Sequence, residues 1–233
     1  MKRTSSTFYC FSPPIMVITM LSEVTLFAYT LLRYKMTLIT RVVSMMLLFL
    51  ALFQWAEFNV CGGHNAQMWS HIGFVSITLL PALAIHLISL IAKKKNTLLK
   101  AISYTVSAIF AVLFGLSSSD ISAHACGGNY AIFQIADKVG GFYFLYYYFW
   151  LFIGIGLCLY YIMKANKKIR QALILQIVGY LSFLLPTGIV NTINPKTIEG
   201  LPSIMCGFAV IYAFILVFGI VPLTINKRGL RKA

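Results

Sequence analysis

Acidic residues are scarce in this sequence. Among 233 residues only five are Asp or Glu, against 19 Lys and Arg, and charged residues make up 10% of the chain. Soluble domains carry about 25% charged residues, so this composition excludes an ordinary soluble globular protein. The hydrophobic content of 60% and the mean hydropathy of +0.85 instead predict a chain that lies in a bilayer.

Compact chemical signatures are also missing. The sequence contains no His-Glu-x-x-His, His-x-x-x-His or Cys-x-x-Cys, the spacings that identify many metal sites without a structure. The net charge of +14 comes from short basic clusters between apolar runs, which is typical of membrane loops, so we predict no nucleic-acid partner. No cleavage site follows the first apolar run, and we expect the N-terminus to be retained.

Seven apolar stretches are long enough to cross about 30 Å of hydrocarbon as helices. They lack the strand-like alternation of a membrane barrel. We therefore predict an all-α fold, a seven-transmembrane-helix bundle that forms a single transmembrane domain over residues 1–233. The predicted spans are residues 14–32, 42–60, 72–92, 101–118, 139–163, 172–190 and 202–224.

The distribution of Lys and Arg predicts the orientation of this bundle. The loops on one side, with the C-terminal tail, hold fifteen of these residues, and the other side holds only four. The positive-inside rule then places the C-terminus in the cytoplasm and the N-terminus outside. We expect a multi-pass protein of a cell membrane. The four basic residues on the predicted outer side are Lys2, Arg3, Lys138 and Lys196.

Two Cys-Gly-Gly segments fall on the predicted outer side. Cys61 directly follows the second span, and Cys126 lies in the long loop between the fourth and fifth spans. An oxidising compartment would allow them to form a disulfide. Two free thiols or a shared metal site are the alternatives.

Two acidic residues lie inside predicted spans. Glu23 is near the middle of the first, where a charge is costly, so we expect it to be protonated or paired inside the bundle. Glu57 lies about one turn below the outer end of the second span. The spacing of Gln54, Glu57 and Cys61 places them on one helix face, which we expect to meet neighbouring helices.

Polar and aromatic residues from most of the spans gather toward the predicted outer side, and this pattern favours an outward-facing intramembrane binding pocket. The tyrosines of the fifth span also fit an interfacial aromatic belt, which needs no ligand. The candidate ligand-binding residues are Gln54, Glu57, His71, His124, Tyr143, Tyr147, Asn191 and Ser203.

A metal site is an alternative interpretation of the same region. Glu57, His64, His71 and His124 offer suitable donor atoms for zinc or iron. Their spacing matches no compact motif, so their convergence would depend on tertiary packing.

Four short motifs resemble a family of small uncharacterised bacterial seven-helix proteins. They are Gln54-x-x-Glu57 in the second span, Pro81 in the third, His124 ahead of Tyr130, and Ser203-x-x-Cys206 in the seventh. The chain departs from that family at Phe58, where a glycine is common. The resemblance, which extends distantly to the seven-helix sensor regions of bacterial histidine kinases, implies the architecture, a bacterial inner membrane and a role for Glu57. It implies no reaction.

Three functions follow as hypotheses. The first is a receptor-like or small transporter protein that binds a small molecule, lipid or ion with Glu57 as polar anchor. The second is a metal-dependent intramembrane enzyme that uses Glu57 with His71 and His124. The third is a structural subunit whose polar face meets another membrane protein. Membrane lipids are the expected partners in all three.

Overall fold

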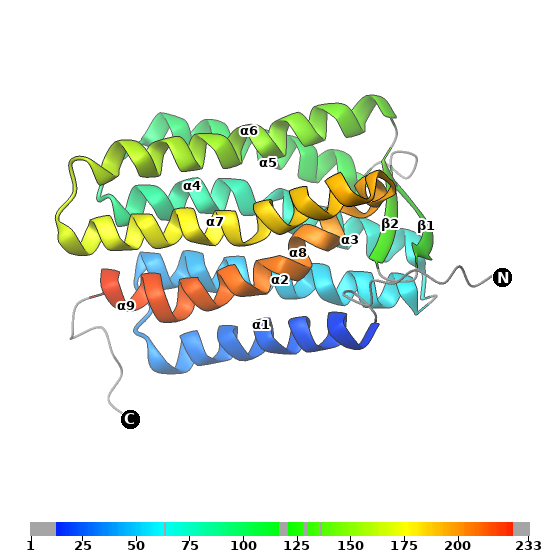
Figure 1. The fold of residues 1–233 in the computed structure, drawn as a ribbon, viewed down its shortest axis with the longest axis horizontal. Coiled ribbons are helices and arrows are strands. Elements are labelled where there is room, and N and C mark those ends of the chain that lie inside the picture. The colour runs from blue at the N-terminus through cyan, green and yellow to red at the C-terminus, as the bar shows by residue number, and fades with distance from the viewer. Residues whose placement is uncertain (1–12, 63, 117–120, 128–129, 136, 226–233) are drawn as a thin grey trace.

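The structure, a computed structural model, consists of long helices that run roughly parallel, with a short hairpin at one end (Figure 1). It describes residues 13–62, 64–116, 121–127, 130–135 and 137–225, without the side chains of residues 13, 121–127, 130–135, 137, 138, 196 and 199. Within these ranges, seven helices are long and apolar enough to cross a membrane, which confirms the predicted seven-helix membrane architecture.

The first four spans are built from five helices. They are α1 (Pro13–Arg33), α2 (Leu38–Cys61), α3 (Ala66–Thr78) with α4 (Leu80–Ile91), and α5 (Thr97–Leu116). The last three are α6 (Asp137–Ile162), α7 (Lys167–Ile193), and a composite of α8 (Leu201–Phe214), the π-helix η2 (Ile215–Ile220) and α9 (Val221–Thr224). A 3-10 helix, η1 (Pro195–Gly200), precedes α8.

Several helices extend beyond the predicted apolar stretches, because polar side chains cap their first turns. Thr37 accepts a hydrogen bond from the Thr40 backbone N–H at the start of α2, and Asn166 accepts one from Ile169 at the start of α7. Asn65 caps α3 in the same way, so this helix begins at Ala66 rather than at residue 72. Caps satisfy the N–H groups that a helix start leaves without partners.

The third span breaks between α3 and α4, where Pro81 lies in the first turn of α4. Proline lacks the N–H group that an unbroken helix would use. The Tyr146 hydroxyl of α6 donates a hydrogen bond to the Thr78 carbonyl at this break, at 2.7 Å, and also bonds the Ser107 hydroxyl of α5, at 2.6 Å. Tyr146 thus ties three spans together at the interruption.

The last span contains a second irregularity, the π-helix η2. A π-helix shifts the pattern of backbone hydrogen bonds and leaves carbonyl groups available to other donors. Tyr34 directly follows α1, and its hydroxyl donates a hydrogen bond to the Val217 carbonyl at 3.0 Å. The irregular turn is therefore anchored to the first span.

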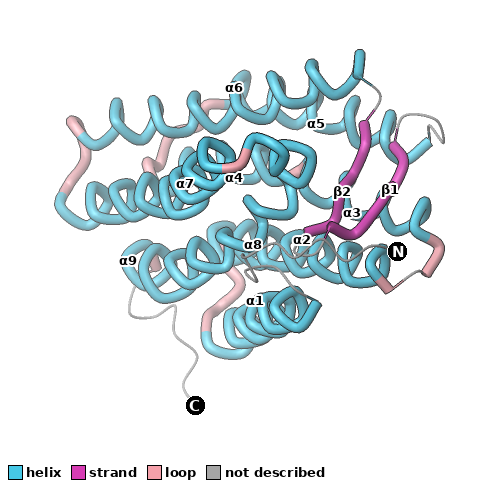
Figure 2. The backbone as a smooth tube through the Cα atoms, turned by 45° about the vertical axis from the view of Figure 1, so that its right-hand side comes forward, coloured by secondary structure: helices cyan, strands magenta, loops and turns pink. Residues whose placement is uncertain are grey.

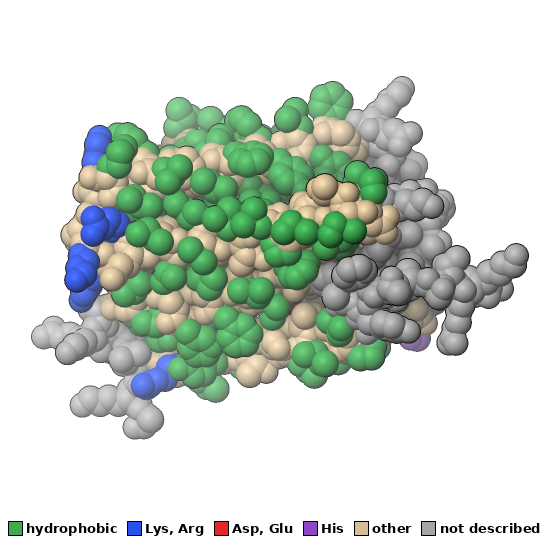
Figure 3. All heavy atoms as spheres, in the orientation of Figure 1, with side chains coloured by type: hydrophobic (Ala, Val, Ile, Leu, Met, Phe, Trp, Pro, Cys, Tyr) green, Lys and Arg blue, Asp and Glu red, His purple; other side chains and the backbone are tan. Residues whose placement is uncertain are grey.

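Basic residues gather at one end of the bundle, which we call the basic end (Figure 3). The α1–α2, α4–α5 and α6–α7 connections all lie there, because successive spans alternate in direction. Exposed apolar side chains cover the surface between the two ends, as expected for contact with lipid. The Lys and Arg residues whose side chains the structure describes are Arg33, Lys35, Arg41, Lys93, Lys94, Lys95, Lys100, Lys164, Lys167, Lys168 and Arg170.

The opposite end carries a two-stranded antiparallel hairpin, and we call it the hairpin end (Figure 2). Strand β1 (Ile121–Gly127) packs on α2 and α3, and β2 (Tyr130–Ile135) packs on η1 and α8. The sequence-based prediction treated this segment as a loop, so the hairpin is an addition to an otherwise helical fold.

Candidate functional site

Gln54 and Glu57 of α2 lie on one helix face, as their spacing predicts, and both point into the bundle. Gln54 is 2% exposed and Glu57 is 1% exposed. Trp55, between them in sequence, is exposed toward the lipid-facing surface. The polar stripe on α2 therefore faces the interior of this chain, close to the hairpin end.

Helix α8 supplies the neighbours of Glu57. The Ser203 side chain hydrogen-bonds to the Glu57 carboxyl group. Cys206, one turn further along α8, is free, buried, and close enough to Glu57 for an electrostatic interaction. The Ser203-x-x-Cys206 and Gln54-x-x-Glu57 motifs thus meet across the α2–α8 interface.

Glu23 reaches the same region from α1. Its side chain is fully buried at 0% exposure and interacts electrostatically with Glu57 and Cys206. We call Glu23, Gln54, Glu57, Ser203 and Cys206 the carboxyl site. The first, second and last spans contribute to it.

Several polar atoms of the carboxyl site have no hydrogen-bond partner among the described residues. They are both carboxyl oxygens of Glu23, Oε1 of Glu57 and Nε2 of Gln54. Buried polar groups are normally paired with protein or with ordered water. The described Lys and Arg side chains gather at the basic end, the opposite end of the bundle from Glu57. The site therefore offers hydrogen-bond acceptors, with one amide donor, to a small polar species.

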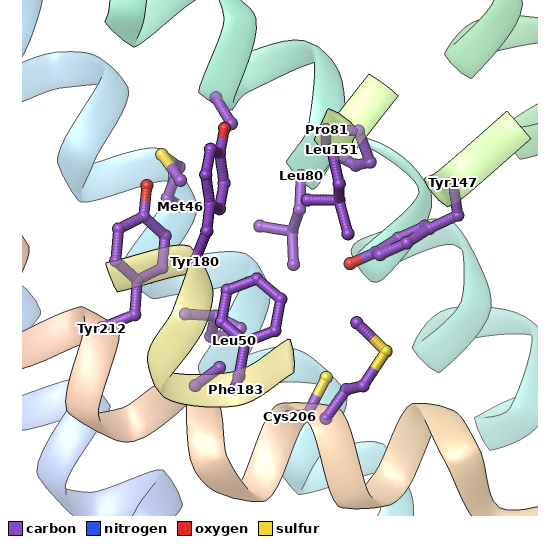
Figure 4. A pocket seen from close by; sticks show the side chains of 13 residues that line it. Met46, Leu50, Leu80, Pro81, Tyr147, Leu151, Tyr180, Phe183, Cys206 and Tyr212 are labelled. Atoms are coloured by element: carbon purple, nitrogen blue, oxygen red, sulfur yellow. The ribbon is translucent and has the colours of Figure 1, made fainter. Parts of the chain in front are cut away.

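A narrow cavity, which we call the central cavity, adjoins the carboxyl site (Figure 4). Its volume is about 40 Å³, and Cys206 and Tyr147 lie on one side with Tyr180 and Tyr212 on the other. The Tyr147 hydroxyl points into it. A smaller cavity of about 20 Å³ shares Tyr147, Met205 and Cys206 with it. These volumes suit water or a small ion rather than a bulky ligand.

Tyr143 has a packing role that the sequence did not indicate. Its ring is 2% exposed and packs against Phe74 and Phe114, with ring centroids 5.9 Å and 4.9 Å away. Its hydroxyl accepts a hydrogen bond from the Thr78 hydroxyl at 3.2 Å. Tyr143 therefore joins α3, α5 and α6, whereas Tyr147, one turn on, faces the central cavity.

The predicted polar residues of the loops and helix ends make local contacts instead. His71 hydrogen-bonds through Nδ1 to the Phe114 carbonyl of α5, and its Nε2 lies 2.9 Å from Nε2 of Gln67. Asn191 accepts a hydrogen bond from the Thr197 hydroxyl at 2.6 Å. His64 is exposed, and the side chain of His124 lies outside the described residues. None of these contacts joins the carboxyl site.

The metal interpretation depends on convergence of Glu57, His64, His71 and His124. In the part of the chain that the structure describes, no group of three or more His, Cys, Asp or Glu side chains could hold a metal ion. The ring of His71 faces α5, while Glu57 faces α8. The described residues therefore do not form the zinc or iron site considered from the sequence.

A second polar group lies on the far side of the central cavity, and the sequence-based prediction missed most of it. Gln176 of α7 donates from Nε2 to the Tyr212 hydroxyl of α8. Tyr180, one turn after Gln176, is 1% exposed, and its hydroxyl lies near the Gln176 side chain but makes no hydrogen bond of ordinary geometry to any described residue. The spacing of Gln176 and Tyr180 was the available signal, since it places both on one helix face.

No protein-family model and no curated protein matches this sequence. The resemblance carried by the four short motifs therefore stays a prediction. The geometry of the described residues carries the functional argument.

Proposed function

We propose that this integral membrane protein binds a small cation, or the cationic or hydrogen-bond-donating group of a small molecule, at the carboxyl site. One observation carries the proposal: Glu23 and Glu57 are fully buried, and three of their carboxyl oxygens have no partner among the described residues. An intramembrane carboxyl group is costly to retain, and such residues commonly mark ion or substrate sites. Receptor-like and transporter-like functions both use such a site.

The burial of the polar side chains favours this function over that of a structural subunit. Gln54, Glu57 and Ser203 are each 2% exposed or less. A polar face that served another membrane protein would lie on the lipid-facing surface of this chain. These three side chains are instead enclosed by the helices of the same chain.

The proposed orientation places the basic end in the cytoplasm and the hairpin end outside, in a bacterial inner membrane. Eleven Lys and Arg residues have described side chains, and their gathering at one end supports the orientation. The resemblance to a bacterial family is the basis for the proposed membrane. Glu57, near the hairpin end of α2, would then be reached from outside.

Cation-dependent stability tests the binding function. A ligand that binds only the folded protein raises its stability, by about 2.7 kcal/mol at a hundred times Kd. We expect sodium, potassium or ammonium chloride to raise the thermal unfolding temperature of the detergent-purified protein above that in choline chloride. The Glu57→Gln variant keeps the shape of the side chain but removes the negative charge, and we expect it to lose this response.

Tyr104→Phe is the matched control, because the Tyr104 hydroxyl bonds His86 at 3.0 Å, away from the carboxyl site. This variant should respond to cations as the unmodified protein does. An unfolding temperature that is the same in all four salts, or a response that persists in Glu57→Gln, would reject the proposed function.

We also propose a disulfide between Cys61 and Cys126. Cys158 and Cys206 are free and buried, whereas Cys61 is not among the free thiols. Strand β1, which contains Cys126, packs on α2, which ends at Cys61. Alkylation of the denatured, unreduced protein should leave both cysteines unmodified in mass spectrometry, with modification only after reduction. Alkylation of Cys61 or Cys126 before reduction would contradict the pairing.

A further inference from the structure

Among the described residues, the buried polar side-chain atoms without a partner belong to only three spans. Every such side chain among the described residues belongs to α1, α2 or α7. Because unpaired buried polar groups are costly, their concentration points to a species that satisfies them together. The residues are Glu23, Ser44, Gln54, Glu57, Gln176 and Tyr180.

The buried serines of the other spans provide a direct comparison. Ser76, Ser89 and Ser107 each donate a hydrogen bond to the carbonyl four residues earlier, at 2.8 to 2.9 Å. This is the usual arrangement for a serine inside a helix. Ser44 is equally buried, at 4% exposure, but its hydroxyl makes no such bond and has no other partner among the described residues. Its environment, not its residue type, sets it apart.

These atoms span much of the membrane thickness. Ser44 lies near the basic end of α2, and Glu57 lies 13 residues further on, about 20 Å along a helix that rises 1.5 Å per residue. That is about two thirds of the 30 Å hydrocarbon core. Gln176 and Tyr180 face the interior from the middle of α7. The unpaired groups therefore form a series along the bundle axis rather than a single cluster.

The central cavity lies between the two ends of this series. At about 40 Å³ it has room for about three water molecules, since one water needs about 10 to 15 Å³. The Tyr147 hydroxyl points into it, and Tyr180 and Tyr212 line its opposite side (Figure 4). Water in this cavity would connect the carboxyl site to the Gln176–Tyr180 group.

A larger cavity opens at the basic end. It has a volume of about 530 Å³ and is lined by Lys93, Asn166, Lys168 and Thr224, with apolar residues that include Ile39 of α2. Its size and polar lining suit bulk water. Along α2, Ser44 comes after Ile39, which lines this basic-end cavity, and before Met46, which lines the central cavity.

We propose that the carboxyl site and this series of polar groups form a proton path through the bundle. Glu57 and Glu23 take up and release the proton at their carboxyl oxygens. Water in the central cavity carries it past Tyr147 and Tyr180, and it leaves past Ser44 into the basic-end cavity. Hydroxyl and amide groups can each accept and donate hydrogen bonds, so they orient the water without a lasting charge.

The narrowness of the path favours a proton over a metal ion as the species carried. Leu50, Leu80 and Phe183 line the central cavity, and they offer no oxygen atoms to replace the hydration shell of a metal ion. Transport of a bare metal ion through this region would therefore be costly, whereas a proton moves between neighbouring water molecules. The inference uses the carboxyl site of the proposed function but does not depend on the ligand that binds there.

Proton flux into liposomes tests the path. The full chain is reconstituted into phosphatidylcholine liposomes that contain the pH-sensitive dye pyranine, and a valinomycin-mediated potassium gradient makes the interior negative. We expect the unmodified protein to acidify the interior faster than protein-free liposomes do, and Glu57→Gln to lose this flux. Tyr180→Phe and Ser44→Ala, which each remove one unpaired hydroxyl, should lower the flux by about tenfold or more.

Matched variants separate the path from general effects on the fold. Ser76→Ala removes a buried hydroxyl and Tyr104→Phe a half-buried one, both from hydrogen bonds outside the path, and both variants should keep the flux of the unmodified protein. All variants are compared at equal amounts of folded protein, judged by thermal unfolding. Flux no greater than in protein-free liposomes, or Tyr180→Phe and Ser44→Ala at the unmodified rate, would overturn the proposal.

The two proposals fail in distinguishable ways. Proton flux without a cation-dependent rise in unfolding temperature would reject the ligand-binding function alone. A cation-dependent rise that is lost in Glu57→Gln, without proton flux, would reject the path alone.

Discussion

Replacement of Gly179 by alanine is expected to destabilise the bundle by about 3 kcal/mol or more, because the new methyl group has no space. A Cβ atom at this position of α7 would lie 2.6 Å from Cε2 of Tyr212 and closer still to its Cδ2. Tyr212 cannot easily turn away. Its hydroxyl accepts a hydrogen bond from Gln176, and its ring lies 5.9 Å from that of Tyr180 and 6.0 Å from that of Phe183.

Gly188→Ala is the matched control on the same helix. Apart from its chain neighbours and the nearby backbone of α7, no described atom lies within 4 Å of the Cβ position at Gly188. This variant should therefore be as stable as the unmodified protein or slightly more so, since alanine favours helix over glycine. Thermal unfolding and gel filtration of the detergent-purified variants would measure the difference. Equal unfolding temperatures for Gly179→Ala and Gly188→Ala would show that α7 and α8 do not pack as closely as described.

The close packing at Gly179 could not have been predicted from the sequence. Both Gly179 and Gly188 lie in the sixth apolar stretch, and nothing in their local sequence distinguishes the crowded position from the open one. The difference depends on which face of α7 meets α8. Helical periodicity identifies residues that share a face but does not orient that face toward a particular neighbour.

The seven spans themselves were predictable, because the bilayer sets the length of an apolar helix. The prediction was weakest at the ends of the spans. There, caps such as Asn65 and Asn166 extend helices into polar sequence that hydropathy alone assigns to loops. The hairpin of β1 and β2 was missed for a related reason, since a two-stranded element outside the membrane has no strong hydropathic signal.

The candidate site was predicted in part. The spacing of Gln54 and Glu57, with the Ser203-x-x-Cys206 motif, indicated two polar faces, and the structure brings those faces together. Glu23 was expected to be protonated or paired inside the bundle. It lies near Glu57 and Cys206, yet its oxygens have no hydrogen-bond partner among the described residues.

The histidines show the limit of a prediction based on depth alone. His71 was expected at the site because it lies at a similar depth to Glu57, but two side chains at one depth can point to different neighbours. The His71 ring hydrogen-bonds to the Phe114 carbonyl near the end of α5. The Tyr143 ring likewise packs against side chains of α3 and α5. Depth follows from position along the helix, whereas direction depends on how each helix is rotated in the bundle.

Tyr146 occupies another position that only the structure explains. Its replacement by phenylalanine is expected to destabilise the protein by about 3 kcal/mol. This value is near the upper end of the cost of leaving a buried hydrogen-bond acceptor unpaired. Tyr146 is 6% exposed, and its hydroxyl donates to the Thr78 carbonyl at the break between α3 and α4. Phenylalanine would keep the ring but leave that carbonyl without this donor. Ser107 would lose one contact but keep its bond to the Ser103 carbonyl.

Tyr148→Phe is the control for this effect, because it removes a hydroxyl from the same helix at little cost. The Tyr148 hydroxyl donates a hydrogen bond to the Met205 sulfur, at 3.7 Å, and a thioether is a weak acceptor. Thermal unfolding in one detergent should therefore show a clear loss for Tyr146→Phe and little change for Tyr148→Phe. If both variants unfold at the temperature of the unmodified protein, the Thr78 carbonyl is satisfied by another donor, and Tyr146 does not hold the broken span in place.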